Sequence, residues 1–183
     1  MDGDAPGEVL GLRWQDIDLG NRRLQVKQTY GQDGVIRQPK TKASRRAIAL
    51  DTSVVEALDA HREPQVEHRL SIGRAYDSEA DLVFADTLGK PTSQHSLDRA
   101  WKHIRKAAGA PDLRFHDLRH AYASHSLAVG VPLHTIQARL GHAQASTTLN
   151  IYGHALPGAD DVAAGAISQV LGRTADAKSG RKT

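Results

Sequence analysis

Two histidines and an arginine stand close together in the stretch His116-Asp-Leu-Arg-His. If this stretch is helical, the positions i, i+3 and i+4 put His116, Arg119 and His120 on one face, with Leu118 and its apolar neighbours on the other. The planar fork of an arginine fits two phosphate oxygens, and a nearby imidazole can donate a hydrogen bond or move a proton. The segment therefore predicts a cationic helix face that holds a phosphate, with an ordinary solvated polar face as the alternative.

A second group of such residues follows further along the chain. His142 comes directly after Gly141, a glycine placed to end a helix, and Tyr152 follows ten residues later. A phenol with a pKa near 10 is protonated at neutral pH, so attack by Tyr152 needs a base or strong stabilisation of the developing charge. The alternative is that Tyr152 only packs against its neighbours.

A basic loop, QPKTKASRR, supplies further cations. We expect most of these groups to make nonspecific phosphate contacts. A lysine at the tip of such a loop can also protonate a leaving oxygen, and Lys40 and Lys42 are the two candidates. A shift of the hairpin register by two residues would exchange them.

A metal site is a rival interpretation of the histidines. His116 and His120 have the i, i+4 spacing of a helical zinc pair. However, no glutamate follows His116 as in the H-E-x-x-H pattern, Asp117 is expected to point away from both rings, and the chain has no cysteine. We therefore expect neither a metal nor another cofactor.

The composition is that of a folded protein with a slight excess of positive charge. The 183 residues include 24 Lys and Arg, 21 Asp and Glu and ten His, for a formal charge of +3. This balance is compatible with a nucleic-acid partner but does not demonstrate one. No apolar run approaches the roughly 20 residues of a membrane span, and the first residues are acidic rather than signal-like. We expect a cytoplasmic protein without a membrane partner.

Local patterns predict a small sheet early in the chain and helices after it. A short helix is expected over 6–12, and strands over 22–30, 35–37 and 46–50 predict a three-stranded antiparallel sheet. Capping and periodicity predict the remaining elements. They are a helix over 51–70 broken at Pro64, an extended piece over 82–84, a helix over 93–109 that buries Trp101, and helices over 115–130, 133–140, 147–152 and 158–171. This order predicts a mainly α (α+β) fold.

Four segments together resemble the catalytic domain of the tyrosine recombinases, the phage integrase family. They are GEVLGLRWQDIDL, PKTKASRRAIAL, FHDLRHAYAS and LGHAQASTTLNIYGHALP, and the resemblance covers residues 6 to 157. It implies a helical catalytic domain over 1–172, followed by a basic tail over 173–183 that we expect to be disordered. It also implies site-specific DNA recombination or integration, in which DNA strands are cut and rejoined by phosphotyrosyl transesterification without a cofactor.

The resemblance assigns a role to each candidate residue. Tyr152 is the nucleophile, Arg119 binds the non-bridging phosphate oxygens, His116 and His142 assist proton movement and charge stabilisation, and Lys40 is the acid for the leaving group. Double-stranded DNA is the implied partner. Self-association on DNA in a tetrameric synapse and a bacterial or phage-encoded cytoplasmic protein are implied as well.

The sequence departs from the family pattern near its start. Family members carry an arginine three residues before the glutamate that matches Glu8, and here that position is Ala5. Arg13 lies beyond the glutamate and is expected to be structural. We therefore expect weak cleavage, or a catalytically silent DNA-binding relative as the alternative.

The pattern also differs in extent. Family members carry an N-terminal helical domain that closes a clamp around the duplex. We expect this domain to be absent from the chain, and therefore expect weaker and salt-sensitive DNA binding. The helix over 158–171 resembles a segment that packs onto a neighbouring protomer.

Overall fold

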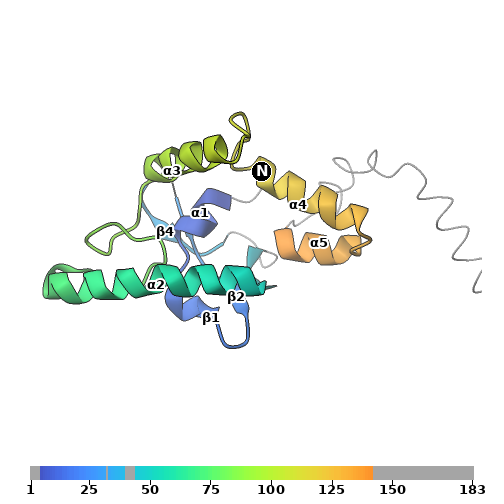
Figure 1. Ribbon diagram of the computed structural model, residues 1–183. Helices are drawn as coiled ribbons and strands as arrows, with labels where there is room; N and C mark the ends of the chain where they lie inside the picture. Colours follow the sequence, from blue (N-terminus) through green and yellow to red (C-terminus); the bar gives the residue numbers. More distant parts are fainter. Residues whose placement is uncertain (1–4, 32, 40–43, 142–183) are drawn as a thin grey trace, which may run out of the picture.

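The computed structural model describes residues 5–31, 33–39 and 44–141. Five strands come early in this part of the chain, and most of the helices follow them (Figure 1). The strands are β1 (Ile17–Asp18), β2 (Arg23–Val26), β3 (Thr29–Tyr30), β4 (Ile36–Arg37) and β5 (Arg46–Ala49). The α-helices are α1 (Ala5–Leu10), α2 (Thr52–Ile72), α3 (Gln94–Ala107), α4 (Asp117–Ala128) and α5 (Leu133–Leu140). Single 3-10 turns are η1 (Trp14–Asp16) and η3 (Gly73–Ala75). The predicted mainly α (α+β) fold is confirmed.

The strands form one three-stranded sheet and one separate two-stranded ribbon, and every pairing is antiparallel. In the sheet, β2 is the central strand, and Leu24 lies opposite Ile17 on β1 and Ile48 on β5. In the ribbon, β3 pairs with β4 with Thr29 opposite Arg37. The predicted three-stranded antiparallel sheet is present, and two of its strands, β2 and β5, lie within the predicted strands 22–30 and 46–50. Its third strand is β1 rather than the predicted strand 35–37.

Two local features account for this difference. The strand β1 has only two residues and turns back at once through Arg22, whose φ is 52°, so it carries no readable alternation. The strand predicted over 22–30 is interrupted at Lys27 and Gln28, between β2 and β3. There the Lys27 side chain pairs with Asp16, and the Gln28 side chain donates to the Gly11 carbonyl. Residues 35–37 therefore pair with β3 and lie outside the three-stranded sheet.

The short helix α1 lies near the centre of the described structure in Figure 1, with α3 above it, α4 to its right, and α2 and β1 below it. Its close approach to β3 depends on Gly11, where a Cβ atom would come within 3.1 Å of the Thr29 backbone. The Gln28 amide also donates to the Gly11 carbonyl at 2.9 Å. These contacts hold α1 against the ribbon and bury Leu10, which is 1% exposed.

Helix α2 is continuous, so the predicted break at Pro64 is wrong. Proline removes one backbone donor and crowds the preceding turn, and both costs are smallest where the backbone is solvated. Pro64 is exposed, and both its neighbouring turns are tied down. His61 binds the Val83 carbonyl at 2.8 Å, and Gln65 accepts from the Trp14 indole at 2.7 Å. The helix begins as predicted, with Asp51 capping the Ser53 amide.

The remaining helices follow their predicted limits closely. Ser93 caps α3, while Gly130 and Gly141 have φ of 80° and 70° after α4 and α5, a conformation that suits glycine at a helix end. Trp101 on α3 is only partly buried, and its indole donates to the Leu113 carbonyl at 2.9 Å. The helices α4 and α5 lie side by side and share a small apolar core around Ala123, Ile136 and Leu140.

None of the helices in the described part of the chain combines the length and the apolar character that a bilayer crossing needs.

A buried carboxylate links α1's exit to the sheet. Asp16 has a side chain only 3% exposed and lies 2.7 Å from Arg13 and 2.9 Å from Lys27. Burial alone would raise the pKa of Asp16, but the hydrogen bonds and charges of the two cations outweigh it, and the pKa lies below its ordinary value. This pairing fits the structural role expected for Arg13.

Replacing this carboxylate is expected to destabilise the fold in a pH-dependent way. Asp16→Asn should lower the free energy of unfolding at pH 7 by about 1–3 kcal/mol, because two cations lose a buried partner. Because the pKa of Asp16 in the folded protein lies below its ordinary value of 3.8, the ionised carboxylate stabilises the fold above pH 3.8. This contribution is lost as the pH falls through the folded pKa. Urea unfolding at pH 7 and pH 3 should therefore show a smaller gap between the two proteins at pH 3; an equal gap at both values contradicts this assignment.

Candidate functional site

Helix α4 places Arg119 on its buried stripe rather than on an open cationic face. Arg119, Ala123 and Ser126 recur at i, i+4 and i+7, and all three are buried. Arg119 is only 8% exposed. The predicted separation of Arg119 from the apolar side of the helix is therefore wrong, because this position lies at the border where α4 meets the rest of the protein.

The two histidines of this segment do lie together, as predicted. The rings of His116 and His120 have their centroids 5.1 Å apart and meet edge to face at 73°. Both side chains are half-buried, and His116 is the last residue before the helix. The Asp117 carboxylate binds Arg114 at 2.9 Å, and hydrogen bonds from this arginine hold the pKa of Asp117 below its ordinary value. The charge of Asp117 is thus paired with that of Arg114.

A largely apolar cavity of about 340 Å³ opens beside Arg119. Both Ala5, at the start of α1, and Glu8, one turn later, line it together with Arg119. Five elements, α1, β2, β5, α4 and α5, contribute to its wall. The remaining lining residues are Val9, Leu12, Leu24, Val26, Arg46, Ile48, Phe115, Leu118, Tyr122, Arg139 and Leu140. Ala5, the position at which the resemblance predicts an arginine in family members, therefore shares a cavity with Arg119.

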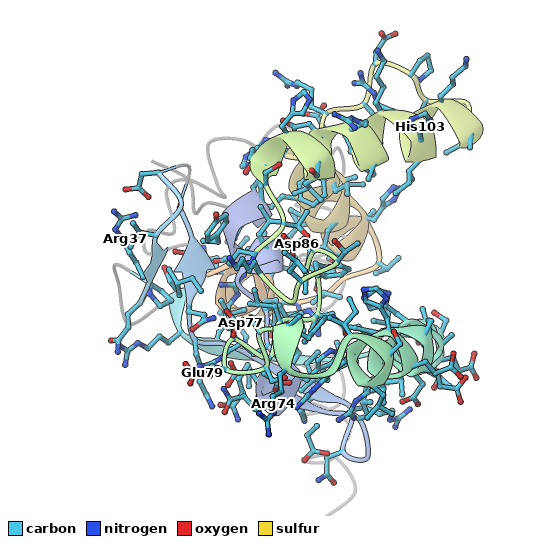
Figure 2. The ribbon with its side chains drawn as sticks, turned by 90° about the vertical axis from the view of Figure 1, so that its left-hand side faces the viewer. Arg37, Arg74, Asp77, Glu79, Asp86 and His103 are labelled. Carbon is cyan, nitrogen blue, oxygen red and sulfur yellow. The ribbon has the colours of Figure 1, made fainter. Side chains whose placement is uncertain are left out.

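A second hollow of about 700 Å³ lies between the sheet and the ribbon and is rich in cations. Lys27, Arg37 and Arg45 line part of it. Arg37 forms an ion pair with Asp33, and its hydrogen bonds lower the pKa of that carboxyl to about 2. Figure 2 shows Arg37 at the outer edge of the ribbon, on the opposite side of the view from His103 on α3. The hollow can accept an anionic partner along this edge.

Four of the predicted site residues lie outside the described part of the chain: Lys40, Lys42, His142 and Tyr152. The helices predicted over 147–152 and 158–171 and the basic tail over 173–183 lie outside it as well. The convergence of these residues with Arg119 stays a prediction. What the structure does give is the approach to His142, since α5 ends at Leu140 and Gly141 turns the chain immediately before it.

Within residues 5–31, 33–39 and 44–141, no three carboxylate or histidine side chains are grouped so that they could hold a metal ion.

One buried ion pair was not predicted from the sequence. Arg46, interpreted there as part of a basic loop, is paired with Glu8 at 2.7 Å, and both side chains are about nine-tenths buried. Alternation along β5 is the signal that could have found it. Arg46 and Ile48 face one side of the strand, while the alternating residues Ala47 and Ala49 are exposed.

The chain is similar to known proteins over most of its length. The model of the phage integrase family matches residues 6–158. A tyrosine recombinase XerC-like protein of Caldanaerobacter subterraneus subsp. tengcongensis is 37% identical over 165 residues, which cover 82% of this chain and 42% of that protein. The chain thus spans about two fifths of that relative's length.

Two solved structures share the fold. The crystal structure of the XerA recombinase has a TM-score of 0.61 at 26% identity, covering 91% of this chain and 52% of that one. The Tn1549 transposon integrase in complex with a circular intermediate DNA has a TM-score of 0.64 at 21% identity, covering 92% and 55% of the two chains. On the evidence of the matched family model and the XerC-like relative, the chain belongs to the phage integrase family.

Proposed function

We propose that this chain is the catalytic domain, over residues 1–172, of a site-specific recombinase that cuts and rejoins DNA through a phosphotyrosyl intermediate. The observation that supports this most directly is the shared cavity of Ala5, Glu8 and Arg119. It brings the family's first arginine position next to the arginine of the His116-x-x-Arg119 motif. Two segments more than 100 residues apart in the sequence thus meet where a phosphate would be held.

In this proposal the phenol oxygen of Tyr152 attacks the phosphorus of one DNA strand, and its proton passes to one of the two histidines, His116 or His142. A bond forms between that oxygen and phosphorus, the bond to the 5′ oxygen breaks, and Lys40 gives the departing oxygen a proton. Lys42 is the alternative donor. The reverse attack by a 5′-hydroxyl rejoins the strand, so no outside energy is needed.

The other residues stabilise the charge that develops at phosphorus. Arg119 donates to two non-bridging oxygens, since its planar fork fits them. His116 and His142 donate further hydrogen bonds or move protons. Neither a metal nor another cofactor takes part in any of these steps.

Double-stranded DNA is the proposed partner. The cationic hollow lined by Lys27 and Arg45 supports this, as does the fold that the chain shares with the DNA-bound Tn1549 integrase. Assembly of several copies on DNA, in a tetrameric synapse, and a cytoplasmic location beside the chromosome belong to the same proposal.

Removing one cation from the hollow is expected to reduce the salt dependence of DNA binding. Each phosphate contact contributes about 0.9 to the slope of log K against log salt concentration. Arg45→Gln should therefore lower the magnitude of that slope by about 0.9. Arg37→Gln is the matched comparison and should change it less, because Asp33 already neutralises Arg37. Fluorescence anisotropy titrations over a range of salt concentrations measure both slopes, and equal changes would contradict the assignment.

The decisive experiment for the proposed function is covalent trapping. Because the target site is unknown, a pool of nicked duplexes with randomised sequence is incubated with the protein. The short fragment released beside the nick diffuses away, so an adduct cannot rejoin. A protein–DNA band that survives denaturation, maps to Tyr152 and is lost in Tyr152→Phe supports the proposal.

The second candidate function is a DNA-binding relative that does not cut. Ala5 is the observation in its favour, because the cavity beside Arg119 then holds one guanidinium fewer. Salt-sensitive DNA binding with no adduct at high protein concentration would favour this alternative. A chelator is the control for the metal interpretation, since loss of cleavage on chelation would contradict the metal-free mechanism.

A further inference from the structure

The guanidinium of Arg46 is bonded to three separate segments of the protein. Its two terminal nitrogens donate to the two Glu8 carboxylate oxygens at 2.9 and 2.7 Å. One of them also donates to the Ser44 carbonyl at 3.0 Å, and Nε donates to the Arg139 carbonyl at 2.6 Å. With a side chain only 10% exposed, this arginine is a buried junction rather than a surface cation.

The first of these segments carries the vacant arginine position. Glu8 lies three residues after Ala5, so both stand on the same face of α1 and line the same cavity. A bidentate pair between a guanidinium and a carboxylate fixes direction as well as distance. The pair with Arg46 therefore sets how α1 presents position 5 to Arg119.

The second segment leads to His142. The carbonyl that accepts from Arg46 belongs to the last turn of α5, three residues before His142. In the other direction, the guanidinium of Arg139 donates to the Ala49 carbonyl of β5 at 3.1 Å. These two reciprocal bonds tie both ends of β5 to the end of α5 and fix the point from which the chain enters the segment of His142.

The third segment borders the two candidate lysines. Ser44 is two residues after Lys42 and four after Lys40. Its carbonyl accepts from Nη1 of Arg46, the nitrogen that also donates to Oε1 of Glu8. One guanidinium thus fixes the point where the basic loop joins β5.

We propose that Arg46 is a positioning residue for DNA cleavage, which sets the relative placement of position 5, the end of α5 and the start of β5 without touching the phosphate itself. This inference rests on the proposed function. A displacement of about 1 Å in a catalytic group can cost about 100-fold in rate. The expected signature of losing Arg46 is therefore a slow chemical step with DNA binding retained.

The test is a single-turnover measurement of adduct formation at saturating nicked DNA, with the DNA dissociation constant and the melting temperature measured alongside. Arg46→Lys keeps the charge beside Glu8 but has no planar fork to serve three acceptors. We expect its cleavage rate to fall about 100-fold and its DNA affinity to stay within about threefold. Arg13→Lys is the matched control, since it makes the same change at another partly buried arginine–carboxylate pair. It should lower the rate by no more than about threefold.

A charge-swapped double variant, Glu8→Arg with Arg46→Glu, separates positioning from the ion pair. It restores opposite charges, but a carboxylate at position 46 cannot donate to the Ser44 and Arg139 carbonyls. A melting temperature equal to that of the natural chain, with a cleavage rate that stays low, supports the proposal. A return of both the melting temperature and the cleavage rate to the values of the natural chain contradicts it, because the ion pair alone would then suffice.

The remaining outcomes also decide the matter. An Arg46→Lys rate that falls no further than that of Arg13→Lys overturns the inference, and so does unfolding of both Arg46 variants at the assay temperature, which makes Arg46 a stability residue. Failure of the proposed function looks different. In that case neither the natural chain nor its Ala5→Arg variant forms a Tyr152 adduct, although both bind DNA.

Discussion

Replacing Ala5 with arginine is expected to raise the rate of covalent adduct formation by about 10²–10³. Removal of one preorganised donor from a site that stabilises an oxyanion costs about this factor, and the substitution restores such a donor. The structure makes the gain plausible, because Ala5 and Arg119 line one cavity of about 340 Å³ with room for another side chain. The rate is measured in a single turnover on nicked DNA at saturating protein.

Two other substitutions at the same position separate the causes of such a gain. Ala5→Met fills space without adding charge, and Ala5→Lys adds charge without a planar fork. We expect no gain from the methionine and a gain of less than about tenfold from the lysine, since a point charge replaces only part of a bidentate contact. An unchanged rate in Ala5→Arg would mean that the family's first arginine does not correspond to position 5. Equal gains from all three would mean that filling the cavity, rather than binding phosphate, limits the reaction.

The parts of the fold that sequence predicts well are those decided within a few residues. Ser93 as a helix cap, Gly141 as a helix end and the limits 133–140 of α5 are examples. Each depends on one side chain or one backbone conformation that the residue type strongly favours. The fold class follows from the order of such elements and is confirmed.

The parts that sequence does not predict depend on distant contacts. Pro64 signals a helix break, yet α2 runs through it because the neighbouring His61 and Gln65 are held by the segment Leu82–Val83 and by Trp14. The end of β2, and with it the choice of strands in the three-stranded sheet, depends on the ion pair between Lys27 and Asp16. Neither contact leaves a trace in the local pattern of hydrophobic residues.

The candidate site divides in the same way. The proximity of His116 and His120 could be predicted from their spacing and is confirmed, whereas the catalytic roles of His116 and Arg119 stay a prediction. Burial of Arg119 could not be predicted, since it depends on how α1 and the sheet pack against α4. The contacts of Arg46 could not be predicted for the same reason, since its partners Glu8 and Arg139 lie 38 and 93 residues away in the sequence.

Substitution of Arg119 by lysine is expected to lower the cleavage rate by about 10²–10³ while DNA binding changes little. A single phosphate among several contributes a small part of the total affinity, whereas this guanidinium serves the reacting phosphate. Lysine keeps the positive charge but not the two parallel donors, so the loss reports geometry rather than charge. Because Arg119 is only 8% exposed, the variant's stability is measured in parallel.

Arg105→Lys is the control for this substitution. Arg105 is half-buried on α3 and donates to the Leu113 carbonyl at 3.3 Å, so it shares the burial of Arg119 to some degree but does not line the cavity. If Arg119→Lys loses activity only in proportion to its unfolded fraction, or no more than Arg105→Lys, then Arg119 supports the helix packing and does not bind the phosphate. A loss of about 10² or more in a fully folded protein, well beyond that of Arg105→Lys, supports phosphate recognition by the planar fork of Arg119.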